Sequence, residues 1–130
     1  MAFTTGAREL IAEFTIWGQP KPKERPRRGK AGNFYTPRDT VNRETAVLDA
    51  FELVAPLWEP SIELIRLEVE AHFEGRVISD GDNIFKLVGD ALNKRAYRDD
   101  KQVKQGAFEW FENAGDRART DVRLYILGES

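Results

Sequence analysis

Cysteine is absent from this chain, and histidine occurs only once, as His72. Without cysteine, the sequence excludes a disulfide framework, a thiolate zinc site and catalysis by a cysteine nucleophile. A single histidine also argues against a Ser-His-Asp triad and against a metal site built from several histidines. Carboxylates, lysine and arginine are therefore the residue types left to carry any chemistry.

Long apolar runs are missing as well. No stretch approaches the roughly 20 apolar residues that a membrane-spanning helix needs, so we expect no membrane partner. Residues 1–8 contain no apolar core of a secretory signal, which argues against export. With 130 residues, of which 41% are hydrophobic and 32% charged, the composition predicts one small globular domain over residues 1–130.

Charge is distributed unevenly along the chain. Residues 18–43 hold eight basic and two acidic residues, a net charge of +6, whereas the whole chain carries −2. Residues 18–35 are rich in proline and glycine and poor in apolar residues, so we expect a flexible loop there. We expect this loop to bind DNA phosphates, although a solvated linker is the simpler alternative. Its basic residues are Lys21, Lys23, Arg25, Arg27, Arg28 and Lys30.

Apolar periodicity predicts an α/β fold with a small mixed sheet and the element order β-α-β-α-β-β. Strands are expected at 14–17, 63–73, 102–112 and 120–127, and helices at 37–55 and 83–94. We expect the last two strands to pair as a hairpin, because residues 113–116 form a turn. Thr36 is expected to cap the first helix, and Trp17 to pack in the core. His72 is expected to be a strand-surface residue and not a ligand.

An acidic cluster surrounds the second predicted helix. Asp80 and Asp82 follow the end of a strand, and Asp99 and Asp100 lie in the return loop after the helix. Several carboxylates repel one another unless a cation lies among them, and donors that are all oxygen suit Mg²⁺ or Mn²⁺. Such a site performs phosphoryl chemistry, in which Lys86 would add positive charge beside the phosphate.

Simpler interpretations of the same residues stay open. Asp82 alone is typical of a helix cap, and Asp99 with Asp100 is typical of an acidic turn. Lys86 and Asp90 are spaced as an ordinary surface ion pair.

The acidic cluster and the basic loop both lie within longer motifs. One runs Asp80-x-Asp82-Asn83-x-x-Lys86-x-x-x-Asp90-Ala91-Leu92 and continues as Asp99-Asp100-x-Gln102-Val103; the other is Gly18-x-Pro20-x-Pro22-Lys23-x-Arg25-Pro26-Arg27 with Tyr35-Thr36-Pro37. The first resembles the RusA family of Holliday junction resolvases, and the second resembles phage and prophage members of it. Gly81 departs from the family pattern, which often has a larger residue there.

The resemblance implies a homodimeric, Mg²⁺-dependent endodeoxyribonuclease with a RusA-like fold. It would resolve Holliday junctions and other branched DNA by paired symmetric nicks, in recombination, repair or phage DNA processing. The implied metal ligands are Asp80, Asp82 and Asp100, with Asp99 as a further candidate and Lys86 as a catalytic residue. Mn²⁺ is a possible substitute, and no organic cofactor is implied.

The resemblance also implies a protein of the bacterial or phage-infected cytoplasm. The alternative function is a module that binds branched or single-stranded DNA without cutting it. That alternative accounts for the basic loop, but it leaves clustered aspartates unexplained, since acidic groups beside phosphate are unfavourable without a metal.

Overall fold

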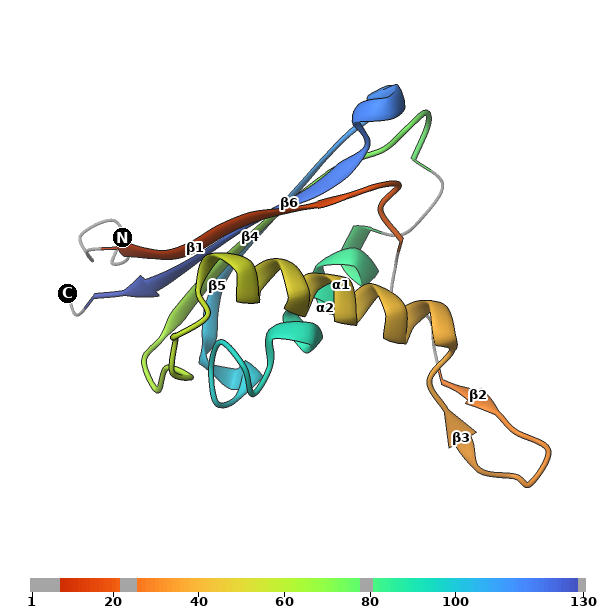
Figure 1. The fold of residues 1–130 in the computed structure, drawn as a ribbon, viewed down its shortest axis with the longest axis horizontal. Helices are drawn as coiled ribbons and strands as arrows, with labels where there is room; N and C mark the ends of the chain where they lie inside the picture. The colour runs from red at the N-terminus through yellow and green to blue at the C-terminus, as the bar shows by residue number, and fades with distance from the viewer. Residues whose placement is uncertain (1–7, 22–25, 78–80, 129–130) are drawn as a thin grey trace.

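Two layers make up the structure, a four-stranded sheet and a pair of helices that cover one of its faces (Figure 1). The computed structural model describes residues 8–21, 26–77 and 81–128. The strands of the sheet are β1 (Arg8–Trp17), β4 (Ile65–His72), β5 (Val103–Phe111) and β6 (Arg119–Leu127). The helices are α1 (Arg38–Val54) and α2 (Gly81–Leu92). This architecture confirms the predicted small mixed sheet with two main helices.

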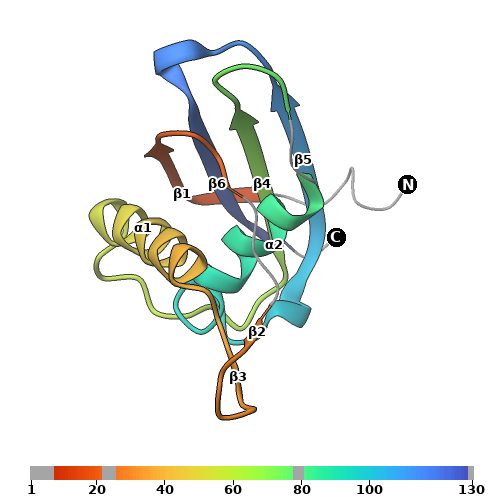
Figure 2. The same cartoon turned by 90° about the vertical axis from the view of Figure 1, so that its right-hand side faces the viewer.

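The sheet has the strand order β1-β6-β4-β5, which Figure 2 shows across its width. Strands β4 and β5 are parallel, and α2 supplies the crossover that parallel neighbours require. Strand β6 pairs antiparallel with both β1 and β4. Within the described residues, no helix is long and apolar enough to cross a membrane.

The expected hairpin between the last two strands is wrong, because β4 lies between β5 and β6. The connecting residues 112–118 pass over the end of β4. There the backbone N–H groups of Asn113 and Ala114 donate to the carbonyls of Gly75 and Phe73, at 3.0 and 2.8 Å. The turn residues correctly predict that the chain reverses its direction after β5, but they do not determine which strands β6 pairs with.

The core lies between the sheet and the helices. Alternate residues of β4 are buried, beginning with Ile65 and Leu67, and they belong to the same apolar cluster as the inner face of α2. The five apolar residues predicted for that inner face are all buried: Ile84, Leu87, Val88, Ala91 and Leu92. Burial of an isoleucine, leucine or valine side chain contributes about 1.5–3 kcal/mol, so this stripe fixes how α2 lies on the sheet.

Helix α1 begins one residue later than predicted. Pro37 occupies the N-cap position with ψ of 144°, and no side chain caps the helix, so the expected Thr36 cap is wrong. An extended ψ at Pro37 keeps that residue outside the helix, while its carbonyl accepts the N–H of Val41 at 3.2 Å. Val47 and Phe51 then face the core.

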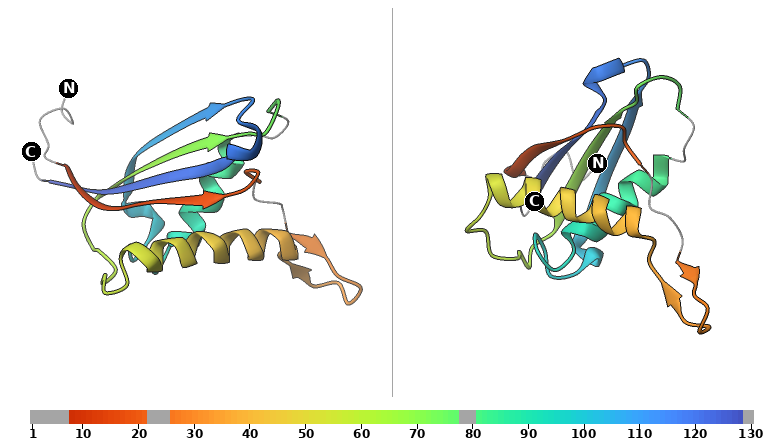
Figure 3. Two further views of the ribbon diagram at one scale, coloured as in Figure 1. Left: turned by 45° about the horizontal axis from the view of Figure 1, so that its top comes forward. Right: turned by 45° about the vertical axis from the view of Figure 1, so that its right-hand side comes forward.

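A small hairpin precedes α1 within the segment that was expected to be a loop. Its strands are β2 (Arg27–Arg28) and β3 (Phe34–Tyr35), paired antiparallel. The hairpin projects from the start of α1 away from the sheet, while both helices lie on one side of the sheet and leave its other face uncovered (Figure 3). The basic residues of the hairpin, Arg27, Arg28 and Lys30, are thus exposed and lie outside the two layers.

Candidate functional site

The first two turns of α2 present an acidic and a basic side chain together. The Lys86 Nζ lies 3.3 Å from the Asp82 Oδ2, one helical turn away, and the two side chains are 60% and 68% exposed. Such an exposed i, i+4 pair contributes only a few tenths of a kcal/mol to stability. Asp82 lies inside the helix, not at its cap, because α2 already begins at Gly81.

Two glycines let the start of α2 approach β5 closely. A Cβ atom on Gly81 would collide with the ring of Phe108, and one on Gly106 would lie 2.8 Å from the ring of Phe85. Asp82, Phe85, Gly106 and Phe108 line a hollow between helix and strand. Gly81, which departs from the family pattern, is therefore required by packing, and this packing positions Asp82.

Asp99 and Asp100 lie at the other end of the crossover, where the short helix η2 (Asp100–Gln102) precedes β5. The Asp99 carboxylate accepts the backbone N–H of Lys101 at 2.9 Å, and the Asp99 N–H donates to the side chain of Gln102 at 2.8 Å. The hydrogen bond from Lys101 lowers the pKa of Asp99. Asp99 thus caps η2, as the simpler interpretation of an acidic turn requires.

Asp100 lies near the C-terminal half of α2. Burial raises the pKa of the Tyr97 hydroxyl, and the negative charges of Asp100 and Asp90 raise it further. The same hydroxyl donates to the carbonyl of Gly89 at 2.6 Å, which fixes this loop against the helix.

Helix α2 separates the two halves of the predicted metal site within one chain. Its 12 residues span about 18 Å, with Asp82 in the first turn and Asp99 and Asp100 beyond the last. Among the described residues, none of these three carboxylates joins a group of three close enough to share an ion. Asp80 lies outside the described residues. A different group, Glu70, His72 and Asp121, does come together.

The hairpin and its base carry the exposed basic residues. Lys21, Arg27, Arg28 and Lys30 are all exposed, whereas Lys23 and Arg25 lie outside the described residues. On the hairpin tip, the Arg28 guanidinium lies 5.9 Å from the centre of the Phe34 ring, which is 70% exposed. A planar cation beside an exposed aromatic ring suits contact with phosphates and bases.

Trp17 was expected in the core, but it is 62% exposed at the end of β1. The Arg119 guanidinium lies 5.9 Å from the centre of its ring. Alternation along β1 sends Trp17 to the uncovered face of the sheet, where no helix buries it. The sequence pattern did not reveal which face lacks helices.

A projecting basic hairpin and an exposed aspartate–lysine pair on one small α/β domain are features of a protein that acts on nucleic-acid phosphates. The family model of the endodeoxyribonuclease RusA matches residues 18–125, which take in both motifs. The chain belongs to this family of Holliday junction endonucleases, and it is accordingly a hydrolase that acts on DNA. A comparison with curated proteins finds no match.

Proposed function

We propose that the chain is a Mg²⁺-dependent endonuclease that resolves four-way junctions and other branched DNA by paired symmetric nicks. The observation that carries this proposal is the exposed Asp82–Lys86 pair at the start of α2, inside the matched family segment. More than half of each side chain is exposed, so solvent ions reach the carboxylate and the ammonium. Recombination, repair or phage DNA processing would supply the branched substrate.

The proposed metal ligands are Asp80, Asp82 and Asp100, with Asp99 as a weaker candidate. Their donor atoms are all carboxylate oxygens, the type that Mg²⁺ and its substitute Mn²⁺ prefer. When bound, the metal would neutralise charge on the scissile phosphate and favour ionisation of a water molecule. Lys86 would hold an ammonium beside the phosphate oxygens, where negative charge increases during the reaction.

A homodimer fits both the substrate and the geometry of the site. A two-fold protein presents two equivalent sites to a junction that needs two symmetric cuts. Because α2 lies between Asp82 and Asp100 within one chain, we infer that Asp100 reaches the Asp82 site from the second protomer. Asp99, which caps η2, would then support Asp100 in position.

This arrangement can be tested by mixing two inactive variants, Asp82→Asn and Asp100→Asn. If one site uses residues of both protomers, a mixed dimer contains one intact site and one doubly altered site, so single nicks return. If each site lies within one chain, every site in the mixed dimer carries a substitution and no cutting returns.

The hairpin is the proposed DNA-binding element. Its exposed basic side chains at Arg27, Arg28 and Lys30 can bind phosphates without reading sequence. Phe34 and Tyr35 are 70% and 49% exposed, so both rings are available to stack on bases unpaired at a branch point. Lys21, Lys23 and Arg25 would extend the contact toward the body of the protein.

Cleavage of a synthetic four-way junction in Mg²⁺, beside a linear duplex of the same sequence, tests the function. The expected result is paired nicks on the junction alone, lost in Asp82→Asn while junction binding persists. Asp116→Asn is the matched control, because Asp116 is an exposed aspartate in η3 (Gly115–Arg117), away from α2. Junction binding without cutting in either Mg²⁺ or Mn²⁺ would instead indicate a non-cleaving DNA-binding module.

A further inference from the structure

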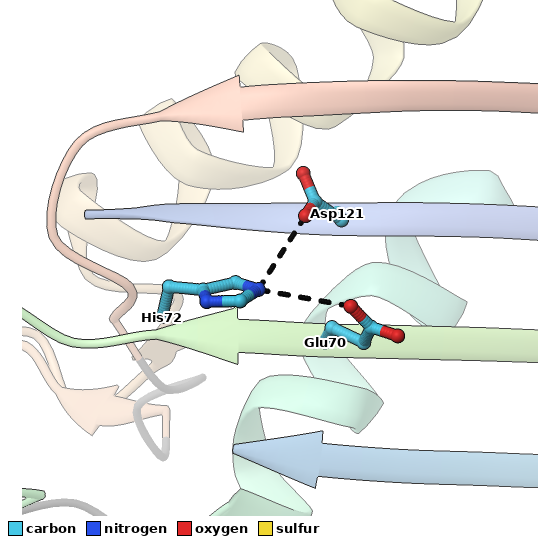
Figure 4. Close-up of side chains that lie close together, drawn as sticks. All are labelled: Glu70, His72 and Asp121. Carbon is cyan, nitrogen blue, oxygen red and sulfur yellow. Dashed lines mark ion pairs between the residues drawn. The ribbon is translucent and has the colours of Figure 1, made fainter. Parts of the chain in front are cut away.

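Three potential metal ligands converge on the uncovered face of the sheet. Glu70 and His72 lie two residues apart on β4, and Asp121 pairs directly with Glu70 in the register of β6. Figure 4 shows the His72 ring directed between the two carboxylates. One ligand atom from each residue lies within 4.8 Å of the others, which makes this the one such group in the part of the chain that is described.

The spacing of these atoms suits a cation better than hydrogen bonds. The His72 Nε2 lies 3.7 Å from the Glu70 Oε1 and 3.5 Å from the Asp121 Oδ2. It is buried and makes no hydrogen bond within the described protein. With a metal ion about 2.1 Å from each atom, the two nitrogen–metal–oxygen angles would be about 110–125°, close to those of tetrahedral coordination.

Neighbouring side chains hold the three ligands in place. The imidazole of His72 stacks on the ring of Phe111, with centres 4.7 Å apart. Thr15 donates to the Asp121 Oδ1 at 2.7 Å, and Arg123 donates to the Glu70 Oε2 at 2.8 Å. These hydrogen bonds hold the carboxylate oxygens that point away from His72, and hydrogen bonds of this kind orient the ligands of metal sites.

One contact opposes a bound cation. The Arg119 Nε donates to the Asp121 Oδ2 at 3.1 Å, so positive charge already lies beside one ligand atom. The same guanidinium also donates to the carbonyl of Arg117 at 3.0 Å, and this second bond lets Arg119 stay ordered if Asp121 turns toward a metal. Affinity should therefore be moderate.

We propose that Glu70, His72 and Asp121 bind a transition-metal dication such as Zn²⁺. An imidazole nitrogen with two carboxylates favours Zn²⁺ over Mg²⁺, which binds oxygen ligands. This site lies on the opposite face of the sheet from α2, and so is separate from the proposed nuclease site. A metal bound there would link the end of β4 to β6. His72 would then be a ligand, contrary to the sequence-based expectation.

Because His72 is the only histidine in the chain, its imidazole gives a single set of nuclear magnetic resonance signals. Full-length protein with isotope-labelled histidine, freed of metal by a chelator, would be titrated with Zn²⁺ and, separately, with Mg²⁺. The expected result is a shift of the Nε2 signal that saturates at one equivalent of Zn²⁺ and is absent with Mg²⁺. Asp82→Asn should behave like the wild type.

Glu70→Gln and Asp121→Asn should each weaken Zn²⁺ binding at least about tenfold, with the fold checked by backbone spectra. Zn²⁺ should also raise the melting temperature of the wild type and of Asp82→Asn, but not that of His72→Gln. The proposal is overturned if the imidazole signals do not shift when Zn²⁺ is added in excess. It is equally overturned if both carboxylate variants, correctly folded, bind Zn²⁺ as tightly as the wild type.

Discussion

The projecting hairpin makes a quantitative prediction about DNA binding. Replacing Arg27, Arg28 and Lys30 by alanine removes three exposed cations from β2 and the hairpin turn, outside the core. The plot of log affinity against log salt concentration has a negative slope. Each lost phosphate contact should make this slope less steep by about 0.9, or by about 2.7 for all three. Between 50 and 200 mM salt, the affinity advantage of the wild type should therefore shrink by about 40-fold.

Fluorescence anisotropy with a labelled four-way junction, without divalent metal so that no cutting occurs, measures this slope. The change should be nearly the same on linear duplex, because phosphate contacts carry no sequence or branch information. Arg117→Ala is the matched control, since Arg117 is exposed in η3 at the far end of the molecule from the hairpin (Figure 1). Equal salt slopes for the wild type and the triple variant would refute the assignment of the hairpin as a phosphate-binding element.

Two further predictions concern stability. Burial raises the pKa of Glu68, but hydrogen bonds from Arg66 and Arg123, at 2.8 and 3.0 Å, outweigh it and lower the pKa overall. This stabilisation is present above the unfolded pKa of about 4.3 and is lost as pH falls through the folded pKa. In urea unfolding, Glu68→Gln should therefore lower the free energy of unfolding by about 2–3 kcal/mol near neutral pH and by less near pH ~3. An equal loss at both pH values would contradict the reasoning. Gly81→Ala should destabilise by about 1–2 kcal/mol and slow cleavage, but in a Phe108→Ala background, where the collision is absent, it should be neutral or stabilising.

Periodicity predicted the elements better than it predicted their partners. The alternation of β4 and the apolar stripe of α2 each depend on one buried face, and both are confirmed. The position of β6 between β1 and β4 depends on pairing between segments far apart in sequence, which no local pattern records. The β2–β3 hairpin also escaped prediction, because two-residue strands are too short to show alternation.

The same distinction applies to the candidate sites. Helical spacing placed Asp82 and Lys86 on one exposed edge, and the structure shows them paired. Asp100 was expected to return beside Asp82, but a parallel crossover sends the chain along the whole helix before the next strand begins. Strand alternation places Glu70 and His72 on one face, whereas Asp121 joins them only through the register of β6.

The uncovered face of the sheet is an unfavourable surface for binding DNA. Its arginines are already paired with carboxylates of β4 and β6: Arg66 with Glu68 along β4, Arg119 with Asp121 along β6, and Arg123 of β6 with Glu68 of β4. A polyanion gains little from positive charge that internal carboxylates neutralise, and it is repelled by those carboxylates at short range. The hairpin carries its cations away from that network, at the end of the molecule where α1 begins. DNA should therefore bind along the hairpin and reach the start of α2, leaving the ion-paired face free.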